Sequence, residues 1–161
     1  MTSIAFVATG QSLHEAARNN DTAYITAFMH KGGDINQKDS KGYTPLILAA
    51  YNNNMETVKL LLEYQCDIDA ADQSGNTALM GATYKGFETI VAMLIMHKAS
   101  VNMRNGNGAT ALFFAATFGR KDIAKFLLIH GADKTMRDRY GKTAYDYAEG
   151  QENEEMMALL K

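Results

Sequence analysis

The chain has 161 residues, of which 47% are hydrophobic and 21% are charged, and its formal net charge is −2. That length suits one folded domain, and the near-neutral balance gives no reason to expect nucleic acid or an acidic membrane as a partner of the whole chain. No apolar run approaches the roughly 18 residues of a membrane-spanning helix.

The first element in chain order is the apolar run Ile4-Ala5-Phe6-Val7-Ala8. It is shorter than the apolar core of a typical signal peptide, and no basic residue precedes it. The single cysteine, Cys66, rules out an intramolecular disulfide and fits a reducing compartment. We therefore expect a cytoplasmic protein. A mature exported chain with an added start methionine would have the same sequence pattern, and that alternative stays open.

A repeat with a period of about 33 residues follows, and four glycines mark it: Gly42, Gly75, Gly108 and Gly141. Two residues after each glycine comes a threonine, and an alanine follows five residues later. The first segment joins later in its cycle, with apolar residues at the matching places: Leu13, Ala16, Ile25, Phe28 and Ile35. Such a period predicts stacked units that bury their apolar faces against one another.

One unit contains two short helices. Thr44 is a good N-cap and Pro45 suits the first helical position, which predicts a helix over about residues 45–53. Val58 and Leu61 lie on the inner side of a second predicted helix, at about residues 55–64. A left-handed stop should follow each second helix, at positions that hold Gly32, Gln65, Lys98 and Gly131.

These residues resemble the ankyrin repeat, whose signature is Gly-x-Thr-Pro-Leu-His-x-Ala-Ala. The nearest copy is Gly42-Tyr43-Thr44-Pro45-Leu46-Ile47-Leu48-Ala49-Ala50, and Gly131-Ala132-Asp133 adds the motif that usually follows the second helix. The resemblance covers roughly residues 10–161. The usual histidine is replaced by Ile47, Met80, Phe113 and Asp146, so we expect its hydrogen bonds to be absent.

The resemblance implies an all-α, ankyrin-repeat solenoid of about four helix-turn-helix repeats plus a C-terminal partial capping repeat. We expect a single domain over residues 1–161, with repeats at about 9–41, 42–74, 75–107 and 108–140 and a cap at 141–161. It also implies a non-catalytic module that binds a protein partner. Whether it acts as inhibitor, antidote, scaffold or secreted effector stays open, and we expect the chain alone to be monomeric.

Few residues suggest chemistry. The four histidines, His14, His30, His97 and His130, do not have metal-ligand spacing. Residues 106–111 resemble a dinucleotide-binding turn, but no strand precedes them and Gly108 is a glycine of the repeat. Cys66 aligns with Ala99 and Ala132, which predicts a small core position. We therefore expect no enzyme, catalytic residue, metal or cofactor.

The resemblance places partner binding on the concave side, at the turn tips and the outward faces of the first helices. If Leu46 and Ala49 face the core, Leu48, Tyr51 and Asn52 face away. The repeat then predicts an aromatic strip of Tyr51, Tyr84, Phe114, Phe118 and Tyr147, with Lys85 beside it and Tyr43 and Tyr140 at the turns. A partner contact is favoured for Tyr51 and Tyr84, whereas for Phe114 packing between repeats is an equal alternative.

Charge is uneven along the chain, because residues 103–142 hold eight Lys or Arg and three Asp. The turn cations are Arg104, Arg137, Arg139 and Lys142. An acidic partner segment could dock there, although charged turn tips are common and a merely solvated surface is the simpler interpretation. The alternative function is binding of nucleic acid or another polyanion through this basic fourth repeat, which the acidic remainder of the chain disfavours.

Overall fold

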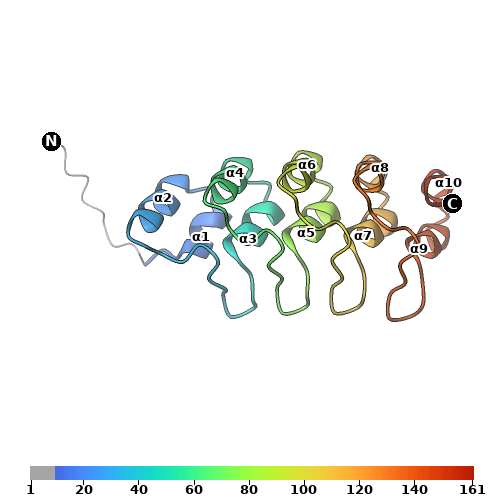
Figure 1. The fold of residues 1–161 in the computed structure, drawn as a ribbon, viewed down its shortest axis with the longest axis horizontal. Coiled ribbons are helices and arrows are strands. Elements are labelled where there is room, and N and C mark those ends of the chain that lie inside the picture. Colours follow the sequence, from blue (N-terminus) through green and yellow to red (C-terminus); the bar gives the residue numbers. More distant parts are fainter. Residues whose placement is uncertain (1–9) are drawn as a thin grey trace.

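The computed structural model describes residues 10–161, so the apolar run 4–8 lies outside the described residues. Within residues 10–161 there are ten helices: α1 (Leu13–Arg18), α2 (Thr22–His30), α3 (Pro45–Tyr51), α4 (Met55–Glu63), α5 (Ala78–Lys85), α6 (Glu88–Met96), α7 (Ala111–Thr117), α8 (Lys121–Ile129), α9 (Ala144–Gly150) and α10 (Glu154–Leu160). They form five helix pairs stacked in a row (Figure 1).

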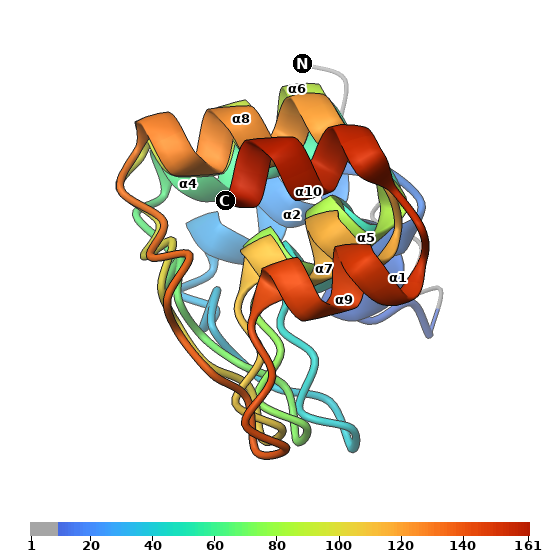
Figure 2. The same cartoon turned by 90° about the vertical axis from the view of Figure 1, so that its right-hand side faces the viewer.

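The helices form two layers. Each first helix (α1, α3, α5, α7, α9) contacts its own second helix, and each of the first four also contacts the next first helix. Figure 2, which looks along the stack, shows long loops extending from the same side of the molecule. The expected all-α solenoid is therefore confirmed. The C-terminal unit, which we predicted as a partial cap, contains both helices of a pair, α9 and α10.

The predicted N-caps begin the first helices. Thr44 Oγ1 accepts the Ile47 N–H at 3.3 Å, and Thr77 makes the equivalent bond to the Met80 N–H. Thr110 has the same extended cap backbone but makes no side-chain cap bond, because the Phe113 N–H donates to its carbonyl oxygen instead. The observed helices end one or two residues before the predicted limits, at Tyr51 and Glu63.

A left-handed residue follows the first helix of every pair and the second helix of the first four pairs. Gln65 (φ 55°) and Lys98 (φ 72°) occupy the predicted stops after the second helices, as do Gly32 and Gly131. A second set, between the two helices of each pair, was not predicted: Asn20, Asn53, Gly86, Gly119 and Glu152. Asparagine tolerates this conformation better than most residues do, which explains why the first two units hold it there.

The four turns are built by one repeated polar residue. Asp39 Oδ1 accepts the N–H groups of Lys41 and Tyr43, both at 2.9 Å, and so folds the turn around itself. The equivalent residues, which make the same pair of bonds, are Asp72, Asn105 and Asp138. The position thus needs a side-chain oxygen, and an amide serves as well as a carboxylate.

Neighbouring turns are joined to one another through their backbones. The Gly106 N–H donates to the Ser74 carbonyl at 2.8 Å, and Arg139 N–H donates to Asn107 in the same way. Gly75 combines φ +80° with a close approach, because a Cβ there would lie 2.8 Å from the Gly106 nitrogen. The turns therefore form a hydrogen-bonded row rather than independent loops.

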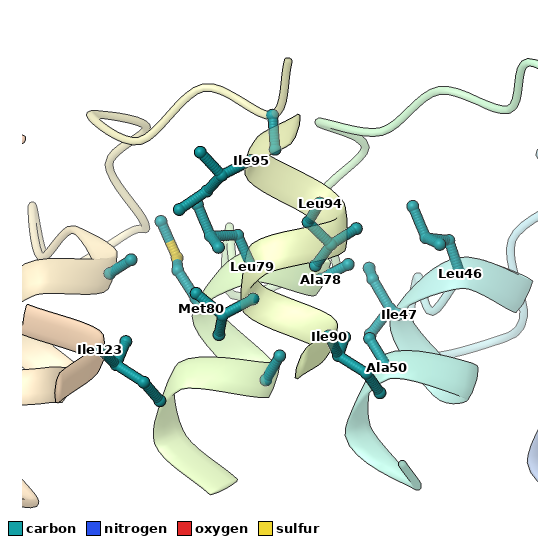
Figure 3. Close-up of a cluster of buried hydrophobic side chains, with 14 of the residues drawn as sticks. Leu46, Ile47, Ala50, Ala78, Leu79, Met80, Ile90, Leu94, Ile95 and Ile123 are labelled. Carbon is teal, nitrogen blue, oxygen red and sulfur yellow. The ribbon is translucent and has the colours of Figure 1, made fainter. Parts of the chain in front are cut away.

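The core lies between the two layers and between successive units. Figure 3 shows Leu79, Ile90 and Leu94 among its members, and all three are buried. Positions one repeat apart supply equivalent side chains, such as Leu61, Leu94 and Leu127. Alanines without exposed surface occupy the contact between first helices, at Ala49, Ala82, Ala115 and Ala148.

We expect Leu94→Ala to lower the free energy of unfolding by about 2–4 kcal/mol, because it opens a cavity in a fully buried site. Met96→Ala, on the exposed side of the same helix, should change it by less than about 0.5 kcal/mol. Urea unfolding followed by circular dichroism measures both. Equal losses would show that α6 does not bury the face described here.

Gly75→Ala should destabilise the chain more than Gly141→Ala. Both positions have positive φ, so both variants carry the backbone cost of about 1 kcal/mol. Only at Gly75 does the new Cβ also meet backbone of the next turn, whereas nothing lies within 4 Å at Gly141. Thermal melting of the two variants tests the difference, and identical melting temperatures would contradict it.

Candidate functional site

A groove of about 510 Å³ lies between the first helices and the turns of the N-terminal half. Its apolar lining includes Ile47, Leu48 and Met80, and its aromatic lining consists of Tyr43, Tyr51, Tyr84 and Phe114. Polar groups occupy its margins, namely Arg18, Asn52, Asp72, Asn76 and Thr77. Five of the twelve residues expected to bind a partner thus line one groove: Tyr43, Tyr51, Asn52, Tyr84 and Phe114.

Three exposed aromatic rings form a continuous row along the first helices. Tyr51 and Tyr84 are stacked, with ring centroids 6.2 Å apart and an interplanar angle of 9°. Phe118 meets Tyr84 edge to face at 4.7 Å. Their exposed fractions are 42%, 37% and 45%, so each ring presents one surface to solvent. We call Tyr51, Tyr84 and Phe118 the aromatic row.

The repeat explains the geometry of this row. Tyr51 and Tyr84 occupy equivalent positions in successive units, in the last turns of α3 and α5. Gly81 lies beside the Tyr51 ring, and a Cβ there would be in ordinary contact with the ring at 3.5 Å. The Lys85 ammonium lies 5.0 Å from the Tyr51 ring centroid, and the Asn52 amide donates to the Leu48 carbonyl.

Two side chains predicted on the outward face have other surroundings than expected. Leu48 lines the groove together with Tyr51 and Asn52, on the face predicted for it, but it is buried rather than exposed. Tyr147, expected to extend the aromatic strip, packs against Phe113 at 5.8 Å, and its hydroxyl donates to Asp138 Oδ2 at 2.5 Å. Phe114 is half-buried against the core and also lines the groove.

The contact between Tyr147 and Asp138 changes the pKa values of both side chains. The hydrogen bond to Asp138, followed by burial, raises the pKa of Tyr147 to about 12. Burial alone would raise the pKa of Asp138, but the Tyr147 hydroxyl and the N–H groups of Lys142 and Tyr140 together hold it below its usual value. The pair therefore stabilises the last turn while Asp138 is ionised.

Four of the predicted residues, Arg104, Arg137, Arg139 and Tyr140, lie outside the groove lining, at the C-terminal turns. Arg104 Nη2 donates to the Arg137 carbonyl at 2.8 Å, and Arg137 Nη1 donates to the Gly141 carbonyl at 2.6 Å. The Arg139 guanidinium lies 4.8 Å from the centroid of the Tyr140 ring. Tyr140 is exposed. Five of the expected partner-binding residues thus form a groove set and four form a turn set, whereas Lys85, Phe118 and Tyr147 belong to neither.

Cys66 is half-buried rather than fully buried, so its expected core position is only partly right. Burial, aided by the nearby Asp67 charge, raises the pKa of its thiol to about 11. The reactive thiolate is therefore scarce near neutral pH. Among residues 10–161, no group of three His, Cys, Asp or Glu side chains is arranged to hold a metal ion.

His14 was missed as a member of the repeat. It lies one full repeat before Ile47, at the position of the signature histidine, within Ser12-Leu13-His14-Glu15-Ala16-Ala17. Its ring is buried, and Nε2 donates to the Gln37 carbonyl at 3.0 Å. The histidine hydrogen bond expected to be absent is therefore present in the first unit. Extending the period backwards from Ile47 would have found it.

Comparison with protein families gives two overlapping matches. A model described as "Ankyrin repeats (3 copies)" matches residues 13–105, and one described as "Ankyrin repeats (many copies)" matches residues 94–148. The chain belongs to the ankyrin-repeat family, whose members generally mediate protein–protein interaction and are typically non-catalytic. Comparison with curated proteins gives no match. In the part of the chain that the structure describes, no helix is long and apolar enough to cross a bilayer.

Replacing Asp138 by Asn should reduce stability near neutral pH and have little effect in acid. Asn keeps an acceptor for the turn, as Asn105 does, but it loses the charge-assisted bond from Tyr147, which is worth about 1–2 kcal/mol. Because the pKa of Asp138 is lowered by folding, its contribution is complete above about pH 4, the usual pKa of aspartate, and disappears as the pH falls through the folded value.

Urea unfolding of wild type and Asp138→Asn at pH 7, 5 and 3 measures this dependence. The difference in the free energy of unfolding between wild type and Asp138→Asn should be similar at pH 7 and 5 and should become smaller at pH 3. Asp122→Asn is the control, since the exposed Asp122 carboxylate pairs with Lys125 at the surface. If the difference between wild type and Asp138→Asn stays constant over all three pH values, the ionised Asp138 does not stabilise the turn in the way described.

Proposed function

We propose that this chain is a non-catalytic protein-binding module whose partner docks in the groove, with the aromatic row as its main contact. The observation that carries the proposal is the stacked Tyr51–Tyr84 pair beside the groove of about 510 Å³. Both rings are exposed although they are large and largely apolar. Tyrosine is among the residues most often found at the energetic centre of protein interfaces.

The row is ordered before a partner arrives, which supports the same proposal. Tyr84 contacts Tyr51 on one side and Phe118 on the other, so its ring is already held in place. A held side chain loses little conformational entropy on binding. Neither tyrosine hydroxyl makes a hydrogen bond within the described residues, so both are available to a ligand.

The groove also offers polar groups that would orient a polypeptide. Asn76 and Asp72 stand on the turn side of the groove and Asn52 on the helix side. Lys85, above the Tyr51 ring, supplies a cation at the margin. A mostly apolar surface with a few polar groups at its edges is typical of a protein interface. We propose Tyr43, Asn52, Lys85 and Phe114 as contacts around the aromatic row.

Inhibitor, antidote and scaffold roles would all use this groove. They differ in what happens to the partner, so an assay of the partner's own activity with and without the chain separates them. Binding of nucleic acid through the fourth repeat is less well supported. Arg104 and Arg137 each donate to carbonyls of the turns, which uses part of their hydrogen-bonding capacity within the chain.

The groove is tested by affinity capture from the native cell extract, followed by mass spectrometry. Tyr51→Ala/Tyr84→Ala should lose the partner, with each truncation weakening binding by about 1–2 kcal/mol, or roughly 5–30-fold. The matched control is Met96→Ala/Ile129→Ala, which removes two exposed apolar side chains from the second helices. Wild type and control should retain the same protein.

Thermal melting of each variant shows whether the fold is intact. We expect Tyr84→Ala to melt much closer to wild type than Leu94→Ala does, because Tyr84 is exposed and Leu94 is not. If the groove variant and the control retain the partner equally, the groove is not the binding surface. If Tyr84→Ala destabilises the chain as much as Leu94→Ala does, Tyr84 acts mainly in the fold.

A further inference from the structure

Four cations gather on the two C-terminal turns, at residues 103–109 and 136–142. They are Arg104, Arg137, Arg139 and Lys142, which we call the basic turn pair. The two turns are fixed side by side by the Arg139 N–H bond to Asn107 and by the Arg104 guanidinium bond to the Arg137 carbonyl. The cations therefore belong to one ordered surface.

Within the described residues, none of these four cations forms an ion pair. The three ion pairs there join Arg18 to Asp39, Lys121 to Glu155 and Lys125 to Asp122. The cations of α8 are thus matched by carboxylates, whereas those of the basic turn pair are not. This contrast separates the turns from an ordinary charged surface, on which cations and carboxylates are interspersed.

The carboxylates nearest to the basic turn pair are already engaged. Asp138 is 7% exposed and accepts bonds from Tyr140, Lys142 and Tyr147. Asp146, whose charge interacts with Arg137 and Lys142, accepts the Thr143 N–H and hydroxyl through Oδ2. The third turn has Asn105 where three others have aspartate, so that turn contributes no carboxylate.

The guanidinium groups keep donors for a ligand. Each has five N–H donors, of which Arg137 and Arg139 use one each and Arg104 uses two. The exposed Tyr140 ring supports the Arg139 guanidinium from one side. Guanidinium groups held in this way bind carboxylates in a bidentate manner with little further loss of freedom.

We propose that the basic turn pair binds an acidic segment, rich in glutamate or aspartate, of the protein that occupies the groove. This rests on the proposed function. The groove is lined by the turn residues Tyr43, Asp72 and Asn76, and the basic turns are the next two in the same hydrogen-bonded row. Because neighbouring helices lie roughly 10 Å apart, the groove and the basic turn pair are separated by about 20 Å. Roughly six residues of extended chain span that distance.

A polypeptide fits this surface better than nucleic acid does. The chain as a whole has a net charge of −2, and the helices of the last unit and their connection carry four exposed glutamates, Glu149, Glu152, Glu154 and Glu155. Those charges would repel a long polyanion but not a short acidic segment placed over two turns. The adjacent groove is mostly apolar and aromatic, as suits amino-acid side chains.

The test uses fluorescence anisotropy of a labelled 12-residue peptide of alternating glutamate and serine at low salt. We expect it to bind at least about tenfold more tightly than the same peptide with glutamine, and to weaken steeply with added salt. Arg137→Gln/Arg139→Gln should weaken binding at least about fivefold, since it removes two of the four cations. Lys142→Gln, which removes no turn hydrogen bond, should weaken it less but measurably.

The matched control is Lys121→Gln/Lys125→Gln, which removes the same charge from cations that already have carboxylate partners. Its affinity for the acidic peptide should stay within about twofold of wild type. Equal binding of the glutamine peptide, or equal losses in control and turn variants, would overturn the proposal. So would tighter binding of a single-stranded oligonucleotide of equal charge, which would assign the surface to nucleic acid.

The two proposals fail separately. Tyr51→Ala/Tyr84→Ala should leave the affinity for the acidic peptide unchanged, because the aromatic row lies outside the basic turn pair. If the acidic peptide does not bind while the groove variant still loses its captured partner, only the basic turn pair is wrongly assigned. If the peptide binds to the turns while the groove variant retains every partner, the groove proposal fails and the turn surface stands alone.

Discussion

Contact between successive first helices at alanine sets the spacing of the whole stack. Ala49, Ala82, Ala115 and Ala148 have no exposed surface, and their single methyl groups let the first helices that contact one another pack closely. A single pair of short helices cannot bury its apolar stripe alone, and each unit depends on its neighbour to do so. Because the spacing repeats, the turns also come within hydrogen-bonding distance of one another, and Gly75 can have no side chain there.

The same spacing produces the candidate site. Side chains one repeat apart fall into rows across the stack, so two tyrosines that are distant in sequence stack 6.2 Å apart. Equivalent positions hold different side chains with different contacts from unit to unit, although the backbone conformation repeats. At one repeat position, Leu48 and Phe114 line the groove, Gly81 lies beside the Tyr51 ring and Tyr147 forms a hydrogen bond with the last turn. A backbone that repeats in every unit thus forms the groove in only part of the stack.

The partners of the charged side chains also depend on whether these side chains lie on the helices or at the turns. Both cations at the start and middle of α8 have carboxylate partners, Lys121 with Glu155 of α10 and Lys125 with Asp122 of α8. At the last turn the Asp138 carboxylate instead accepts N–H groups of its own turn, so it pairs with none of the turn cations. The unmatched charge therefore collects where the chain leaves the helical layers, and it lies in line with the groove.

The sequence by itself determined the period, the helix pairs, the threonine caps and the left-handed stops at Gln65 and Lys98, because each depends on residues close together in the chain. The exposure of Tyr51 and Tyr84 also followed from helical geometry. The tertiary structure decided what stands opposite each side chain. It buried Leu48, turned Tyr147 towards Asp138 and left Cys66 half-buried. A helical period gives the direction of a side chain, but the neighbouring unit decides whether water or protein lies there.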